Sequence, residues 1–130
     1  MKYLVAFIGL ICFNLSLYSQ EETKESEKFV RHFSYGSFFE DGEWGEAQKS
    51  NSTFVFNIND NGDILWYRPD GNKEYFRKIS RIEKGKTDDG VEYQAVGLLD
   101  EKGNEFLLAL YENGVLVLIY HKDFAVRFEP

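Results

Sequence analysis

Apolar and polar side chains alternate with a period of two through much of the chain, which is the pattern of strands with one buried face. In residues 52–71, Phe54 and Phe56 fall on one face, and after an Asp-Asn-Gly turn the alternation resumes with Ile64 and Trp66. Two apolar runs separated by such a turn predict a β-hairpin. The rest of the chain repeats this arrangement.

Further strands are predicted wherever the same alternation lies between turn residues. These segments are 29–35, 75–83, 91–99, 106–111, 115–120 and 124–128. The turns between them contain Pro-Asp-Gly, Asp-Asp-Gly, Glu-Lys-Gly and Asn-Gly, whose glycines accept positive φ. The charged segment 75–83 suits the edge of a sheet. A short helix is the alternative for residues 29–35.

Residues 36–45 are expected to form a loop, because they contain three glycines and an Asp-Gly step. We expect Trp44 to fold back from this loop onto the core. Within the predicted strand 91–99, Gly97 shares a face with Tyr93 and is expected to permit a bend or bulge.

Together these segments predict an all-β domain, an antiparallel meander of seven or eight strands. Parallel pairing needs crossover segments of about a dozen residues or more, and the sequence between the predicted strands contains none. Strands 106–111 and 115–120 are apolar on both faces, so a flat sheet would leave one of these faces exposed. We therefore expect a small barrel or a two-layer sandwich.

The first residues have the features of a secretory signal peptide. Lys2 supplies a positive charge, residues 4–17 are an apolar run too short to span a bilayer, and Ser19 is a small residue suited to cleavage. A membrane anchor is the alternative for this run. The sequence thus predicts a signal peptide over 1–19 with cleavage near Ser19-Gln20, a flexible acidic leader over 20–28, and a single β domain over 29–130. The exported chain is expected to be periplasmic or extracellular.

Cysteine content and charge narrow the expected functions. Cys12, the one cysteine, falls in the predicted signal peptide, so the exported domain is expected to contain neither disulfides nor cysteine-ligated metal. Removing residues 1–19 takes away one of 15 basic residues and none of 22 acidic ones, which changes the net charge from −7 to −8. Such a chain repels phosphate backbones, so we expect no nucleic-acid partner. We expect no membrane span in the mature chain.

Alternate oxygen-bearing side chains in the first hairpin follow the spacing of a calcium-binding EF-hand loop, at Asn57, Asn59, Asn61 and Asp63. Three of these positions are neutral amides, Arg68 occupies the place of the closing glutamate, and the flanks are strands rather than helices. Asn, Asp and Gly are also the residues that a tight turn requires. We interpret the segment as a turn, with weak calcium binding as the alternative.

Other candidate chemical groups are scattered. His32 and His121 lie on the predicted first and penultimate strands without metal-ligand spacing, and the carboxylate pairs Glu40-Asp41 and Asp88-Asp89 lie in predicted loops. The sequence has no G-x-S-x-G, P-loop or G-x-G-x-x-G motif. We therefore expect no catalytic residue, metal site or cofactor, and a protein that is not an enzyme.

Gly42-Glu43-Trp44 resembles the Gly-x-Trp of lipocalins, in which the tryptophan lies close to a basic residue on the last strand. Arg127 is placed to take that part by stacking on the Trp44 ring. The resemblance is confined to these residues. It implies a closed meander and, more weakly, a bound ligand.

A broader set of turn and core residues is similar to small secreted proteins of Bacteroidetes bacteria, in which a tryptophan-led strand precedes a meander with D-x-D-G and V-D-E-D-G turns. The residues that carry this similarity are Trp44, Phe54-Val55-Phe56, Ile64, Tyr75, Thr87-Asp88-Asp89-Gly90, Tyr93, Leu99-Asp100-Glu101-Lys102-Gly103, Val117 and Tyr120. The similarity implies export and an all-β domain, and it transfers no activity or binding residue.

Three function hypotheses follow from the sequence. The first is a non-enzymatic binding or interaction domain for an unknown protein, with an apolar surface made by Tyr111, Leu116, Leu118 and Tyr120. The second is a small lipocalin-like calyx for an apolar ligand, lined by Phe54, Phe56, Trp66 and Phe106. The third is a hydrolase that uses loop carboxylates.

Overall fold

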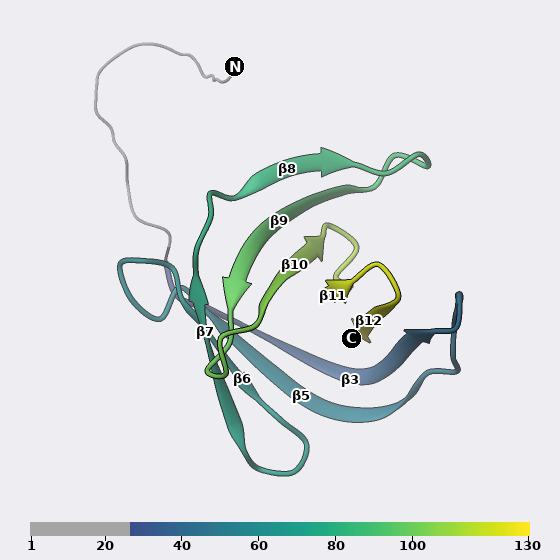
Figure 1. Ribbon diagram of the computed structural model, residues 1–130, viewed down its shortest axis with the longest axis horizontal. Coiled ribbons are helices and arrows are strands. Elements are labelled where there is room, and N and C mark those ends of the chain that lie inside the picture. The colour runs from purple at the N-terminus through teal and green to yellow at the C-terminus, as the bar shows by residue number, and fades with distance from the viewer. Residues whose placement is uncertain (1–26) are drawn as a thin grey trace.

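Residues 27–130, the part of the chain that the computed structural model describes, form one antiparallel sheet that curls into a barrel (Figure 1). Helix is absent from this part of the chain, so the predicted all-β class is confirmed and the alternative helix at 29–35 is wrong. The ten strands, labelled as in Figure 1, are β3 (Phe29–Glu40), β4 (Glu43–Trp44), β5 (Gln48–Phe56), β6 (Ile64–Tyr67), β7 (Lys73–Lys78), β8 (Glu83–Lys86), β9 (Glu92–Leu99), β10 (Glu105–Tyr111), β11 (Leu116–His121) and β12 (Phe124–Glu129).

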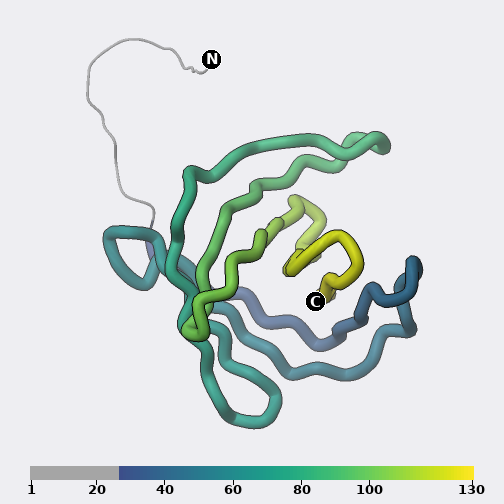
Figure 2. Tube along the Cα trace, in the orientation of Figure 1, coloured from purple at the N-terminus to yellow at the C-terminus, as the bar shows by residue number. Residues whose placement is uncertain are grey.

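Eight of these strands close into a ring in the order β10-β11-β12-β3-β5-β6-β7-β9, and β9 returns to pair with β10. β4 pairs only with β3, and β8 only with β9, so these two strands extend the ring without belonging to it. Figure 2 shows β8 and β9 along the top of the view, with β3 and β5 on the opposite side of the barrel. The structure is therefore a small barrel and not a two-layer sandwich.

Aromatic rings fill the middle of the barrel. Phe54 stacks on Trp66 with ring centroids 5.4 Å apart, and Phe128 meets both rings edge-on. Phe76 and Phe106 extend this packing, with their centroids 4.9 Å apart. Full burial of a phenylalanine contributes on the order of 1.5–3 kcal/mol, so this cluster is a main source of stability for the barrel.

Both faces of β10 and β11 contain buried apolar side chains, although the surroundings of the two faces differ. Phe106 and Leu108 point into the barrel and are buried by the opposite wall. On the outer face, Ala109 is paired with Val117 and both are almost completely buried, whereas Leu107 is 48% exposed. Closure of the barrel thus covers the inner face, as expected from the sequence.

Strand β3 is longer than predicted, because the segment expected to be a loop continues it to Glu40 before a turn at Asp41 and Gly42. The ladder to β5 shifts register between Phe33 and Tyr35, so Phe33 is buried while Tyr35 is 43% exposed. A β-bulge changes the face on which the following side chains lie. Alternation over residues 29–35 predicts that Phe33 and Tyr35 share a face, and this prediction is wrong.

The predicted strand 75–83 is divided into β7 and β8. Both pair with the same edge of β9: β7 at Leu98 and Leu99, and β8 from Glu92 to Ala95. β6 begins at Ile64, which pairs with Phe76 of β7. The chain after β7 therefore has no partner in β6. The second edge of β8 pairs with no strand of residues 27–130, which leaves the barrel wall open at this position.

Connections alternate between the two ends of the barrel, as antiparallel pairing requires. One end, which we call the open end, carries the turns 57–63, 87–91 and 112–115 together with β8. The opposite end, which we call the closed end, carries the turns 41–47, 68–72, 100–104 and 122–123.

Candidate functional site

A cavity of about 990 Å³ occupies the open end of the barrel. This volume lies near the upper limit of the range of about 300–1,000 Å³ found for ligand pockets. Its floor is formed by the buried side chains of Phe56, Ile64, Val96 and Leu108, where the aromatic core ends. Above the floor, Phe29 and Leu110 continue the apolar lining.

The cavity exists because the barrel wall is incomplete on one side. Chain 57–63 turns away after Phe56, and β8 follows β9 without a second neighbour among the described strands. Side chains of β9 and β10 that point inward at this level, such as Val96 and Leu110, therefore face open space rather than an opposite strand.

Basic side chains line the upper wall of the cavity. Arg31 pairs with buried Phe54, and Lys78 pairs with buried Leu98, so both share the inward face of their strands. Lys84 pairs with Gln94, which lies opposite Leu110 on the inner face of the sheet. The cavity thus has an apolar floor and a cationic entrance.

The loop at 57–63, expected to be a turn or a weak calcium site, is organised by the buried carboxylate of Asp63. The amides of Asn59 and Asn61 donate to its oxygens at 2.9 and 2.6 Å, Lys78 N donates at 2.8 Å, and the Tyr75 hydroxyl donates to Oδ2. Burial opposes ionisation, but these hydrogen bonds together lower the pKa of Asp63 to about 2.

These contacts give the asparagines a structural role. Asn59 Oδ1 accepts from the backbone N–H groups of Gly62 and Asp63, both at 3.1 Å, while Asn57 donates to the carbonyl of Glu27. The side-chain oxygens of Asn59 and Asp63, which the EF-hand spacing would direct to an ion, are therefore used in hydrogen bonds within the protein. Over residues 27–130, no group of three His, Cys, Asp or Glu side chains has the geometry of a metal site.

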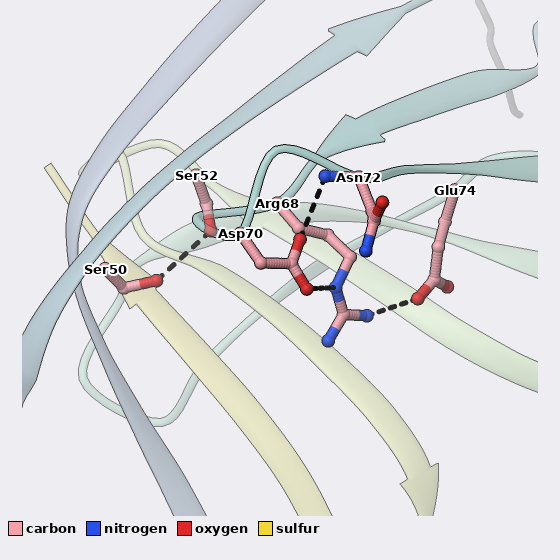
Figure 3. A network of polar contacts seen from close by, with 6 residues as sticks. All are labelled: Ser50, Ser52, Arg68, Asp70, Asn72 and Glu74. Carbon is pink, nitrogen blue, oxygen red and sulfur yellow. Dashed lines mark hydrogen bonds and ion pairs between the residues drawn. The ribbon is translucent and has the colours of Figure 1, made fainter.

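Arg68 lies at the closed end of the barrel, beside Asp70 and Glu74 (Figure 3). Its guanidinium lies 4.7 Å from the Trp66 ring centroid, pairs with Asp70 at 3.8 Å and forms a close ion pair with Glu74. Burial, with the nearby charge of Glu74, raises the pKa of Tyr120 to about 12. Arg68 thus packs on the Trp66 ring at the end of the barrel opposite the cavity.

The calyx residues predicted from the sequence are divided between core and cavity. Phe54, Trp66 and Phe106 are 0%, 8% and 5% exposed and fill the interior, so they do not line the cavity. Phe56 is on its floor. The lining prediction is corrected accordingly, because the aromatic residues fill the centre of the barrel and the space lies above them.

The predicted interaction surface also needs correction. Leu116 and Leu118 are both 0% exposed and belong to the core. Tyr120 is half-buried beside Phe106 and Phe124. Tyr111 lines the cavity and contacts Tyr93, with ring centroids 5.3 Å apart. The four residues thus form no common surface.

The histidines and carboxylate pairs are not brought together. Near the start of β3, His32 Nδ1 lies 2.9 Å from Thr53 Oγ1, at hydrogen-bonding distance. His121 is the last residue of β11 and lies beside Phe124 at the closed end. Glu40-Asp41 and Asp88-Asp89 are exposed in turns at opposite ends of the barrel, and neither pair borders the cavity.

Stacking between Trp44 and Arg127 is confirmed, with the guanidinium carbon 4.4 Å from the ring centroid. Phe39 packs against the same ring at 5.4 Å, and Arg127 Nε pairs with Glu129 at 3.2 Å. Arg127 lies on the outer face of the barrel, because Val126 and Phe128 on either side of it point inward. Phe39 pairs with Ala125, which shares this outer face with Arg127. Trp44 is 37% exposed there, so the expectation that it packs on the core is wrong.

Arg31, Lys78 and Lys84 were not singled out by the sequence, although a signal for two of them is present. Arg31 falls between Phe29 and Phe33, and Lys78 follows Phe76 by two positions, so both continue the apolar face of a strand. A charged residue at such a position marks either a barrel mouth or an edge.

Comparison of the chain with protein-family models, curated proteins and solved structures finds no match. Among residues 27–130, no helix has the length and apolarity needed to cross a membrane. The predicted signal peptide lies outside the residues that the structure describes, as does most of the predicted leader.

Proposed function

We propose that this protein is a binding protein that holds a small apolar or amphipathic ligand in the cavity at the open end of its barrel. The observation that carries the proposal is the cavity of about 990 Å³ with a floor of buried aromatic and aliphatic side chains. Pockets of this size with apolar walls and a few polar groups are typical of small-molecule sites. Export to the periplasm or beyond, as the sequence predicts, is part of the proposal.

Burial of the ligand supplies the affinity. Removing about 200 Å² of apolar ligand surface from water contributes about 5 kcal/mol at 25 cal/mol per Å². Loss of translational and rotational freedom offsets part of this gain. The aromatic floor is held rigid by the core, so little further ordering of protein side chains is needed when a ligand binds.

This proposal combines the binding role and the calyx expected from the sequence, at a different position. The interaction-domain hypothesis loses its named surface, because Leu116 and Leu118 lie in the core. The hydrolase hypothesis has no support from the position of Glu40-Asp41 and Asp88-Asp89, which lie in exposed turns away from the cavity.

A neutral fluorescent probe, N-phenyl-1-naphthylamine, tests the proposal. We expect its emission to rise on titration with the purified protein, because the dye moves from water into an apolar pocket. Leu110→Trp fills the cavity and is expected to weaken binding about tenfold or more, whereas Leu107→Trp on the outer face of the same strand changes it by less than about twofold.

Two results would overturn the proposal. One is the absence of any saturable rise in emission with the folded wild-type protein. The other is equal weakening by the two tryptophan substitutions, which would place the dye outside the cavity.

A further inference from the structure

Charge on the cavity wall identifies the chemical class of the ligand, an inference that rests on the proposed function. The whole chain carries a net charge of −7, yet four basic side chains line the cavity: Arg31, Lys78, Lys84 and Lys86. Strand register directs all four to the inner face of the barrel, where β-barrels normally place apolar residues.

Lys78 is the last residue of β7, pairs with Leu98 of β9 and is half-buried. Its backbone N–H is bound by Asp63, while its side chain extends over Gly62, where an added Cβ would lie 3.1 Å from Lys78 Cδ and 3.5 Å from Nζ. Within residues 27–130, no carboxylate lies within 4.0 Å of this ammonium group. The Lys78 ammonium group therefore lies over Gly62, next to the cavity, and has no ion-pair partner among residues 27–130.

Arg31 is held by an aromatic stack. Its guanidinium carbon is 4.8 Å from the Phe29 ring centroid, and Phe29 in turn stacks on Phe56 with centroids 4.5 Å apart and rings inclined by 7°. One nitrogen donates to the carbonyl of Val30. The remaining donors of the guanidinium find no carboxylate among the described residues.

Acidic side chains at the entrance compensate these cations only in part. Glu92 pairs with Lys86 at 3.9 Å, and the Glu112 carboxylate accepts from the backbone N–H of Glu92 at 3.2 Å. Glu27 lies beside Asn57 at the rim. Arg31, Lys78 and Lys84 therefore stand around an apolar pocket without an ion pair to the described chain.

We propose that the ligand is an amphipathic anion with a single alkyl chain, such as a long-chain carboxylate. The alkyl chain packs on the floor of Phe56, Ile64 and Leu108, and the anionic group lies at the entrance between Arg31, Lys78 and Lys84. An anion is favoured there because it would meet three cations that have no carboxylate partner among the described residues. A cationic amphiphile of the same chain length is disfavoured by the same groups.

Displacement of the bound naphthylamine dye by three amphiphiles of equal chain length tests this inference: dodecanoate, dodecanol and dodecyltrimethylammonium. We expect dodecanoate to bind about tenfold more tightly than dodecanol, and dodecyltrimethylammonium more weakly than both. The preference is expected to shrink as ionic strength rises, since added salt screens charges.

Substitution of the entrance cations tests whether their charge, rather than the integrity of the fold, determines dodecanoate binding. Lys78→Met with Lys84→Met is expected to weaken dodecanoate binding about tenfold while leaving dodecanol within about twofold, because methionine keeps most of the apolar length. Lys122→Met, an exposed cation at the closed end, is the control and is expected to change neither. Glu27→Gln is expected to strengthen dodecanoate binding.

Equal affinity for dodecanoate and dodecanol would overturn the anionic class while leaving the apolar pocket in place. Equal weakening of both amphiphiles by the double substitution, in a protein with unchanged melting temperature, would likewise contradict a role of charge. Failure of the dye itself to bind would instead remove the proposed function, so the two failures are distinguishable.

Discussion

At the scale of single residues, Asp63 shows how one carboxylate can organise a turn that the sequence predicts without showing what stabilises it. Its two oxygens accept from two amides, a phenol and a backbone N–H, and it is 3% exposed. Charge-assisted hydrogen bonds of this kind are stronger than neutral ones and are costly to break inside a fold. The turn 57–63 is therefore a rigid rim of the cavity.

The lowered pKa of Asp63 predicts a pH dependence of stability. Because its pKa falls from 3.8 to about 2 on folding, the ionised group stabilises the fold by about 2 kcal/mol above about pH 4. This contribution is lost as the pH falls through about 4 towards 2. Urea unfolding of wild type between pH 7 and pH 2 should show the decline.

Asp63→Asn is expected to lower the free energy of unfolding by about 2 kcal/mol at pH 7 and to flatten the acid decline. Asp60→Asn, an exposed carboxylate in the same turn, is the control and should change little. An Asp63→Asn protein as stable as wild type at pH 7 would show that the network carries no net stability.

At the scale of elements, the hairpin of β10 and β11 shows that an apolar face need not be a binding surface. Its inner face joins the core, and on its outer face the paired residues Ala109 and Val117 are only 4% and 8% exposed. Sequence alone leaves both faces equivalent, because alternation specifies that two faces exist and not which of them is enclosed.

This assignment predicts unequal effects of shortening leucines on the two faces. Leu118→Ala removes a fully buried side chain and is expected to lower the free energy of unfolding by about 2–5 kcal/mol. Leu107→Ala removes a side chain that is 48% exposed and is expected to change it by less than about 0.5 kcal/mol. Chemical denaturation of both variants measures the difference, and similar values would contradict the inward placement of Leu118.

At the scale of the whole molecule, closure of the ring by β9 and β10 couples all parts of the barrel. Every strand of the ring has a partner on each side, so local separation of one strand breaks contacts with two others. The two tryptophans report on different parts of this structure, since Trp66 lies in the core and Trp44 on the outer face beside Arg127.

We expect unfolding to be a single cooperative transition, as in most domains of this size. In Trp44→Phe the fluorescence of Trp66 reports on the core, and in Trp66→Phe the fluorescence of Trp44 reports on the β3–β4 hairpin. Each signal should follow the same urea transition as far-ultraviolet circular dichroism of the same variant. A Trp44 signal that changes at lower urea would mean that the hairpin opens independently.

Some of the candidate site follows from local pattern and some does not. The two-residue spacing of Lys78 from Phe76 assigns it to the inner face, as does the position of Arg31 between Phe29 and Phe33. The same spacing cannot show that these positions lie above the filled part of the barrel. Their level relative to the core depends on the register between strands distant in the chain.

The sequence by itself determined the all-β class, the antiparallel hairpins and most of the turns, because alternation and turn residues act over a few neighbouring positions. Tertiary structure alone decided that the sheet closes through β9 and β10, that Leu116 and Leu118 face inward, and that the second edge of β8 has no partner among the described strands and lies beside a cavity. These features depend on pairing between segments far apart in the chain and on how bulky rings fill a closed volume. Local pattern contains neither.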